Sequence, residues 1–340
     1  MKKYIFLLAA ILSPCVVQDT EARELFLGDE CCASSTCDGG RASSTCANRA
    51  SWDVGYASVF LKPYFERDIA FFDYGAAGTP GDEGTRIYEF DWDLEHSPRV
   101  WFGQTGCGGC GWRITYFQFD HETGLYAEAE KLKAEWDMDQ DDSEIIADNG
   151  PNGEPGSIVA SNSLRLHVLD FDVFQNVDVG NLELSISGGV RYVQMDRYYV
   201  AYETYGDEYI IGDHGFDGAG PTLRLEGSRP ACGSMRIFMN GRGSLLFGQE
   251  ELVIRGENTQ NDYNERPSHG VVLPIVELQV GLEWQRRLCG KIVSVRAAME
   301  GQAWIGGGGW NFGQGDGGSG WPTEENFGLC GFVLSGEVGY

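Results

Sequence analysis

Long apolar runs and basic residues are both scarce in this chain of 340 residues. The apolar segment Tyr4–Val17 is shorter than the ~20 residues that a membrane-spanning helix needs, and no later stretch is continuously apolar over that length. Any insertion into a membrane must therefore use β-strands. Only 25 Lys and Arg stand against 51 Asp and Glu, a net charge of −26, which repels nucleic acid and anionic lipid and excludes nucleic acid as a partner.

Histidine is also rare, with five residues, of which only His167 falls in a predicted strand. The chain has no GxSxG motif, and no serine and histidine stand out at neighbouring positions on one face. The sequence therefore predicts a protein that is not an enzyme and that holds no cofactor.

The N-terminus has the pattern of a secretory signal peptide. Met1–Lys3 is basic, Tyr4–Val17 is apolar, and the segment ending at Ala22 has small residues at the spacing that a signal peptidase accepts. We expect residues 1–22 to be cleaved and the mature protein to be exported. A lipoprotein signal, with Leu12–Cys15 as a poor lipobox, is the alternative.

Nine of the ten cysteines follow this signal, which suits an oxidising compartment. Four of them lie in residues 23–51, a segment of small residues that we interpret as a periplasmic arm tied by disulfides. Cys107 and Cys110 form a CxxC motif, and with Cys232 and Cys289 they fall on predicted periplasmic turns. We favour disulfides over a metal or redox site at these positions. The connectivity stays open.

From residue 52 onward, segments of alternating apolar and polar residues dominate. In one of them, Val276, Leu278 and Leu282 fall on one face, and Glu277 and Glu283 fall on the other. Most of these segments reach the length of a tilted membrane strand. The ten candidates are Trp52–Lys62, Pro98–Gln104, Gly111–Phe119, Val159–Phe174, Asn181–Tyr202, Phe216–Gly227, Ser234–Gly248, Val271–Arg286, Lys291–Ile305 and Phe327–Tyr340.

Short and long connections alternate between these candidates without exception. Transmembrane barrels have short periplasmic turns and longer outer loops. The sequence therefore predicts an all-β fold, an antiparallel transmembrane β-barrel of about ten strands, within roughly 8–12, that occupies residues 52–340.

One strand departs from a regular alternation. Near Val168 and Leu169 the pattern changes phase, because polar residues at odd positions such as Arg165 give way to polar residues at even positions such as Asp170. We predict a β-bulge at this point.

Short glycine-rich motifs follow one another along the C-terminal half of the chain: Ser187–Tyr192, Phe216–Pro221, Gly241–Gly248, Val276–Trp284, Glu300–Gln302 and Asn326–Leu329. In sequence and order they resemble the Legionella major outer membrane protein family, and especially its divergent planctomycete-type members. The resemblance implies a signal-bearing outer-membrane β-barrel with porin activity, and it implies no catalytic residues.

If the apolar faces meet lipid, the charged faces line the lumen. Their opposed charges could then select solutes in a channel, or they could neutralise one another and fill an interior that is narrow at about eight strands. The candidate pore-lining residues are Arg191, Arg224, Glu226, Arg236, Arg242, Glu277, Glu283, Arg296 and Glu300.

An acidic segment resembles a calcium loop. Asp137, Asp139, Asp141 and Asp148 stand at offsets that calcium ligands use, but Asp142 occupies the position that needs glycine. We favour a solvated acidic loop and assign no metal.

The sequence thus predicts an outer-membrane barrel that contacts membrane lipid and lets small polar solutes diffuse passively. A closed structural or adhesive barrel, whose acidic surface loops bind cations or partners, is the alternative. A soluble secreted β-sandwich is a third option, and homo-oligomers are left open.

Overall fold

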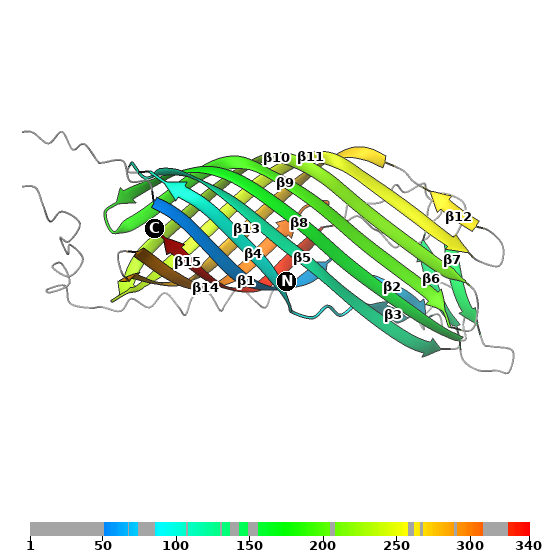
Figure 1. Ribbon diagram of the computed structural model, residues 1–340. Coiled ribbons are helices and arrows are strands. Elements are labelled where there is room, and N and C mark those ends of the chain that lie inside the picture. The colour runs from blue at the N-terminus through cyan, green and yellow to red at the C-terminus, as the bar shows by residue number, and fades with distance from the viewer. Residues whose placement is uncertain are drawn as a thin grey trace, which may run out of the picture.

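Figure 1 shows the computed structural model of the protein. It describes residues 51–66, 68–73, 86–106, 108–129, 131–136, 143–148, 156–204, 208–257, 262–265, 268–288, 291–308 and 326–340. Every regular element in these ranges is a β-strand. No helix among the described residues is long and apolar enough to cross a membrane.

Ten strands form a closed antiparallel barrel in which neighbours in sequence are neighbours in space, and the β10–β11 ladder and the β1–β15 ladder complete the ring. The backbones of Trp52 and Tyr340 exchange hydrogen bonds of 3.2 and 2.8 Å, which places the start of the first strand beside the end of the last. All ten predicted strands and the predicted fold class are confirmed. The strands are β1 (Ser51–Phe65), β4 (Glu95–Thr105), β5 (Cys110–Ala129), β8 (Gly156–Val179), β9 (Leu182–Glu203), β10 (Tyr209–Cys232), β11 (Met235–Glu257), β13 (Ser268–Leu288), β14 (Lys291–Trp304) and β15 (Phe327–Gly339).

Short turns gather at the end of the barrel that holds Ser51 and Tyr340, which we call the periplasmic end. At three of these turns Gly109, Gly180 and Gly233 have φ angles of 75, 64 and 57°, the left-handed region that glycine enters without a steric penalty. The long connections lie at the opposite, outer end. The predicted alternation of short and long connections is confirmed for four of the five outer connections. The β9–β10 connection, which was predicted to be long, has only residues 204–208, because β9 and β10 stay paired as far as Tyr202 and Tyr209.

Further strands lie at the outer end of the barrel, where Figure 1 shows them next to the outer parts of the long strands. The sequence analysis placed these residues in loops, so the outer connections contain more regular structure than predicted. A second sheet has the order β3-β2-β6-β7, with β2 (Ile69–Asp73), β3 (Arg86–Glu89), β6 (Lys131–Trp136) and β7 (Ser143–Asp148), and β12 (Asp262–Glu265) pairs with β11.

Along β8 toward the outer end, the inward-facing residues change from polar to apolar and the outward-facing residues change from apolar to polar. Leu169 faces outward and is 45% exposed, while Asp170 faces inward and is 4% exposed. Closer to the outer end, the inward residue is Leu166, which is fully buried, and Arg165 faces outward. The pairing of β8 with β5 and β9 is continuous through this region. The predicted β-bulge is therefore wrong, because the change in pattern marks the level at which the outward face leaves an apolar band and meets water.

The neighbouring strands change at the same level. Outward-facing Tyr192 is followed by Gln194 on β9, and outward-facing Phe247 is followed by Gln249 on β11. Strands β8 to β11 have 22 to 24 residues, whereas β1, β14 and β15 have 13 to 15. The barrel wall therefore projects beyond the outward apolar band on the side of the long strands, which extend past β1, β14 and β15 in Figure 1.

The position of this band is testable by placing a charge on either side of its edge. Leu223 lies within the outward apolar stretch of β10 and is 70% exposed. Leu223→Arg is expected to cost about 2–4 kcal/mol, because the charge enters hydrocarbon. Gln249→Arg, which lies opposite Asp217 beyond the band, should cost less than about 1 kcal/mol. Urea unfolding from lipid vesicles measures both changes, and equal costs would contradict the assigned edge.

Candidate functional site

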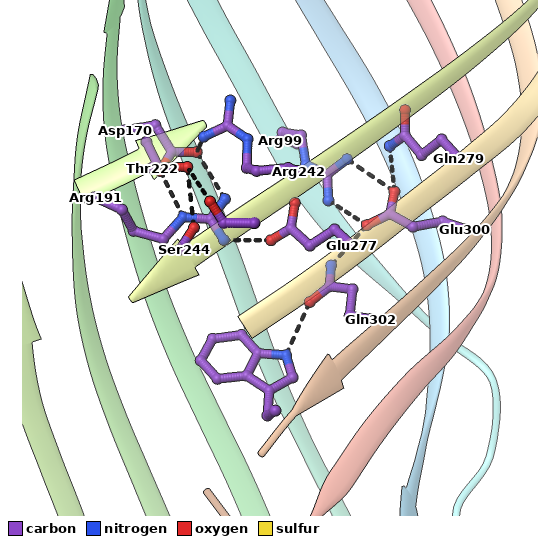
Figure 2. A network of polar contacts seen from close by, with 12 residues as sticks. Arg99, Asp170, Arg191, Thr222, Arg242, Ser244, Glu277, Gln279, Glu300 and Gln302 are labelled. Carbon is purple, nitrogen blue, oxygen red and sulfur yellow. Dashed lines mark hydrogen bonds and ion pairs between the residues drawn. The ribbon is translucent and has the colours of Figure 1, made fainter. Parts of the chain in front are cut away.

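Arginines and carboxylates from six strands meet in the middle of the barrel, and Figure 2 shows how they point toward one another. Arg191 forms a two-point contact with Asp170, at 2.7 and 3.0 Å, and also donates to Glu277. Arg242 bridges Asp170 at 2.7 Å and Asp172 at 2.6 Å. Each buried charge therefore has an opposite charge beside it, which a site without bulk water requires. We define the charge belt as Arg99, Asp170, Arg191, Arg242, Glu277 and Glu300.

Glu300 anchors the other side of the charge belt. Arg99 donates to its two carboxylate oxygens at 2.9 and 2.7 Å. The side-chain amides of Gln279 and Gln302 donate to the same carboxylate at 2.5 and 2.6 Å, and Trp304 donates to Gln302 at 3.1 Å. Glu300 is only 2% exposed, and these four hydrogen bonds compensate for its desolvation.

A second group of ion pairs lies closer to the periplasmic end. Arg296 contacts Glu226 at 2.9 Å and Glu283 at 3.1 Å. Arg224 donates to Glu226 at 2.5 Å, and Arg236 lies 3.8 Å from Glu283. The arginines and glutamates are interleaved, so this part of the interior holds no large excess of one charge.

The structure thus places all nine candidate residues on inward-facing positions and brings them into contact with one another. The sequence analysis missed Arg99, Asp170 and Asp172. Arg99 alternates with outward-facing Val100, a signal that the sequence contained. The two aspartates were obscured by the change of pattern on β8. The candidates are Arg191, Arg224, Glu226, Arg236, Arg242, Glu277, Glu283, Arg296 and Glu300.

The space between these side chains is small at the charge belt. The cavity there has a volume of about 90 Å³, whereas the cavity nearer the periplasmic end, which we call the vestibule, has about 520 Å³. One water needs roughly 10–15 Å³ of such volume, so the charge belt has room for a few waters and not for a hydrated solute. The vestibule is wide and polar, with Asp53, Asn176 and Ser185 in its lining.

The interior on the outer side of the charge belt is filled mainly by apolar side chains. The largest of them are 0 to 1% exposed, and residues of β2 add to them from the first outer connection. Packed apolar side chains leave a polar solute no hydrogen-bonding partners. We call this region the outer core; it includes Phe119, Leu166, Met195, Leu246 and Trp304 from the wall and Ala70 and Phe71 from β2.

Arg197 of β9 ties two outer connections to the wall. Its guanidinium donates to Asp68 at 2.7 Å and to the backbone carbonyl of Gly308 at 2.8 Å. Asp68 also accepts hydrogen bonds from Asn162, at 2.9 Å, and from Trp92. Arg197 is 2% exposed, so this cross-link is buried. This cross-link was not predictable from local sequence patterns, because its members are far apart along the chain.

The structure corrects two statements about histidine. A serine and a histidine do lie side by side: Ser97 Oγ is 2.9 Å from His121 Nε2, and His121 Nδ1 is 2.7 Å from Glu95. Ser97 and His121 are 1 and 4% exposed, and they join β4 to β5 just beyond the last backbone pair of these strands. The pair was missed because its members come from different strands. All five histidines lie in strands, namely His96, His121, His167, His214 and His269.

The calcium and cysteine predictions fall largely outside the described residues. Asp137, Asp139 and Asp141 are not among them, and Asp148 is the last residue of β7. Within the described ranges no three His, Cys, Asp or Glu residues are placed to hold a metal ion.

The arm at residues 23–50 and the residues Cys107 and Cys289 also lie outside the described residues. Cys110 and Cys232 are unpaired thiols, as is Cys330. The structure therefore does not confirm disulfides at Cys110 and Cys232, and those of the arm stay a prediction.

A closed antiparallel barrel with an outward apolar band and a charged interior defines a class, the β-barrels of outer membranes. A family model described as the Legionella pneumophila major outer membrane protein precursor matches residues 44–339. The chain belongs to this family and is a protein of the outer membrane, as the sequence predicted. No curated protein matches it.

Solved structures with similar folds are distant. The outer membrane protease OmpT from Escherichia coli is 11% identical, with 87% of this chain and 97% of that chain covered and a TM-score of 0.46. A mutant of the monoaromatic hydrocarbon channel TodX is 9% identical, with coverages of 85 and 90% and a TM-score of 0.31. A Pseudomonas aeruginosa FadL homologue is 8% identical, with coverages of 86 and 90% and a TM-score of 0.22. We draw no functional argument from similarities this weak.

Arg191 offers a test of how the charge belt is stabilised. Arg191→Met is expected to lower the free energy of unfolding by about 3–5 kcal/mol, because Asp170 and Glu277 lose their buried counter-charge. Adding Asp170→Asn and Glu277→Gln removes those charges and should restore most of the loss. Urea unfolding in lipid vesicles measures the series. A triple variant no more stable than the single one would show that the cost comes from packing instead.

Proposed function

We propose that this outer-membrane protein is a closed barrel that anchors projecting β-structure at the cell surface, and that it does not pass polar solutes in this state. The outer core carries this proposal. It lies across the interior between the charge belt and the outer end, and its side chains are almost completely buried. A hydrated solute that reached the vestibule would meet apolar side chains beyond the charge belt.

The burial and pairing of charges in the charge belt also support a closed interior. Side chains that select ions in an open channel face water, whereas Asp170, Arg191 and Glu300 are 2 to 4% exposed and bonded to one another. Their charges are used to satisfy each other. The pairing is that of a filled interior, the second of the two interpretations that the sequence left open.

Passive diffusion through a narrow pore is the second candidate. The vestibule favours it, because a wide polar cavity on the periplasmic side gives a small polar solute room to enter. This function requires the outer core to move, and with it the segments that Arg197 holds.

We also propose that the protein has no catalytic role. The Ser97 and His121 side chains resemble part of a hydrolase site, but both are buried beneath the barrel wall. The hydroxyl of Ser97 has no exposed surface at which a substrate could bind, and a bond between strands accounts for its contact with His121.

Single-channel recording in planar lipid bilayers tests the closed barrel. The refolded chain is expected to insert, to migrate differently on gels before and after heating, and to pass no discrete current. Steps of constant size would contradict the proposal. In that case Arg242→Glu and Arg296→Glu should change the ion selectivity, since both side chains face the lumen.

A double variant tests whether the charge belt or the outer core blocks the passage of ions through the lumen. Arg99→Ala with Glu300→Ala removes a matched pair and enlarges the cavity at the charge belt without leaving a lone charge. If the outer core closes the lumen, this variant also passes no current. Current in the double variant alone would assign closure to the charge belt.

A further inference from the structure

The vestibule extends from the charge belt to the periplasmic ends of the strands. Its volume of about 520 Å³ is in the range of small-molecule pockets. Carboxylates outnumber arginines in its lining by seven to three. Four of these carboxylates lie within two residues of the periplasmic ends of their strands, namely Asp53, Asp178, Glu183 and Glu337. A cationic ligand that arrives from the periplasm is therefore attracted into the vestibule.

Three of the seven carboxylates have no counter-charge of their own. Among the described residues, Asp178 forms no ion pair, and Asp53 accepts a hydrogen bond from the hydroxyl of Thr105 at 3.0 Å but also forms no ion pair. Asp172 shares Arg242 with Asp170 of the charge belt. The other four carboxylates contact arginines and are balanced by them: Glu183, Glu226, Glu283 and Glu337.

Asp172, at the inner end of the vestibule, is buried and only partly hydrogen-bonded. It is 2% exposed, and its Oδ2 atom accepts a hydrogen bond from Arg242 at 2.6 Å. Its Oδ1 atom has no hydrogen-bond partner in the described part of the chain. Arg113 lies opposite Asp172 in the strand register but contacts Glu337 instead. A buried acceptor without a partner costs free energy, so a donor that reaches this end of the vestibule would be bound.

A stripe without basic residues leads from Asp172 to the mouth of the vestibule. Asp172 and Asp178 are six positions apart on the inward face of β8, which is about 20 Å along an extended strand. The stripe therefore has a carboxylate at each end and side-chain oxygens with one aromatic ring between them. The residues between these ends are Phe174 and Asn176 on β8, with Ser187 and Ser185 beside them on β9.

We propose that the vestibule binds a linear polyamine of the length of spermine along this stripe. One terminal ammonium contacts Asp172 Oδ1 and the other contacts Asp178, while the methylene groups cover the ring of Phe174. The terminal nitrogens of extended spermine are about 16 Å apart, at about 1.25 Å per bond. A hydrogen bond of about 2.8 Å at each end brings the span close to that of the stripe. The ligand enters and leaves on the periplasmic side, so the proposal does not depend on whether the lumen is closed.

The spacing of the carboxylates favours a linear polycation over a metal ion. A calcium ion needs several oxygens within about 2.3–2.6 Å of one point. In the ranges that the structure describes, no three His, Cys, Asp or Glu residues are placed to hold a metal ion. A polyamine carries its charges several ångströms apart, as the vestibule does, and its methylene groups suit the apolar surface between them.

Neutralising either end of the stripe tests the proposal. Asp178→Asn acts at the exposed mouth and leaves the ion pairs of the interior unchanged. Asp172→Asn acts at the inner end. Asp213→Asn is the matched control, because Asp213 is an exposed, outward-facing residue of β10 beyond the apolar band and its replacement changes the net charge equally. Urea unfolding of each variant reports its stability.

The refolded full chain in phosphatidylcholine nanodiscs is titrated with spermine by isothermal calorimetry. The wild type and Asp213→Asn are expected to bind one spermine with equal affinity. Asp178→Asn and Asp172→Asn should each bind about tenfold more weakly, the effect of one charge-assisted hydrogen bond. Putrescine, a diamine too short to span the stripe, should bind the wild type at least about tenfold more weakly than spermine does.

Three results would overturn the proposal. Equal spermine affinity of Asp178→Asn and the wild type would place the ligand elsewhere, and this variant decides the matter if Asp172→Asn does not fold. An equal loss in Asp213→Asn would reduce the binding to general attraction by a chain of net charge −26. Magnesium or putrescine binding as tightly as spermine would show that the length of the ligand is not recognised.

Discussion

Closure of the β10–β11 ladder is the constraint on which the rest of the structure depends, because it fixes the width of the interior. In a ring of ten strands, long side chains from strands that are not neighbours reach one another through the lumen. Arg99 therefore contacts Glu300 and Arg191 contacts Glu277, although these residues are far apart in sequence. A wider ring would leave the same residues in water, where their pairing would stabilise little.

The change in polarity of the inward and outward faces along β8 follows from the two solvents around the barrel, which are lipid within the membrane and water beyond it. Within the membrane the outside is as apolar as any interior, so an apolar lumen would gain nothing from the hydrophobic effect. Directional ion pairs such as Arg191 with Asp170 specify the interior there. Beyond the membrane the outside is water, and burial of Leu166 and Phe119 stabilises the fold as in a soluble protein. In β8, polar residues therefore face inward within the membrane, and apolar residues face inward beyond it.

The sequence carried enough information for the strands and the fold class, because period-two alternation and connection lengths are local signals. Arg242, Glu277 and the other lumen candidates were found for the same reason. The sequence did not reveal their partners, since Arg242 reaches Asp172 across the barrel and no local pattern encodes that distance. The change of phase at Val168 was seen but misinterpreted, because a single strand does not show where the membrane ends.

The order of the barriers along the lumen decides what opening would require. The charge belt can rearrange at modest cost, since Gln279 and Gln302 offer alternative partners and its cavity has room for a few waters. The outer core has no such alternatives. Exposing a large apolar side chain costs about 1.5–3 kcal/mol, and a path through the outer core would expose several at once. Arg197 adds to this cost, because withdrawing the segments around Asp68 and Gly308 removes the carboxylate and the carbonyl that its buried charge contacts. Any conducting state of this barrel must therefore be set by the outer core and its cross-link, and the charged residues that first suggested a pore are the smaller obstacle.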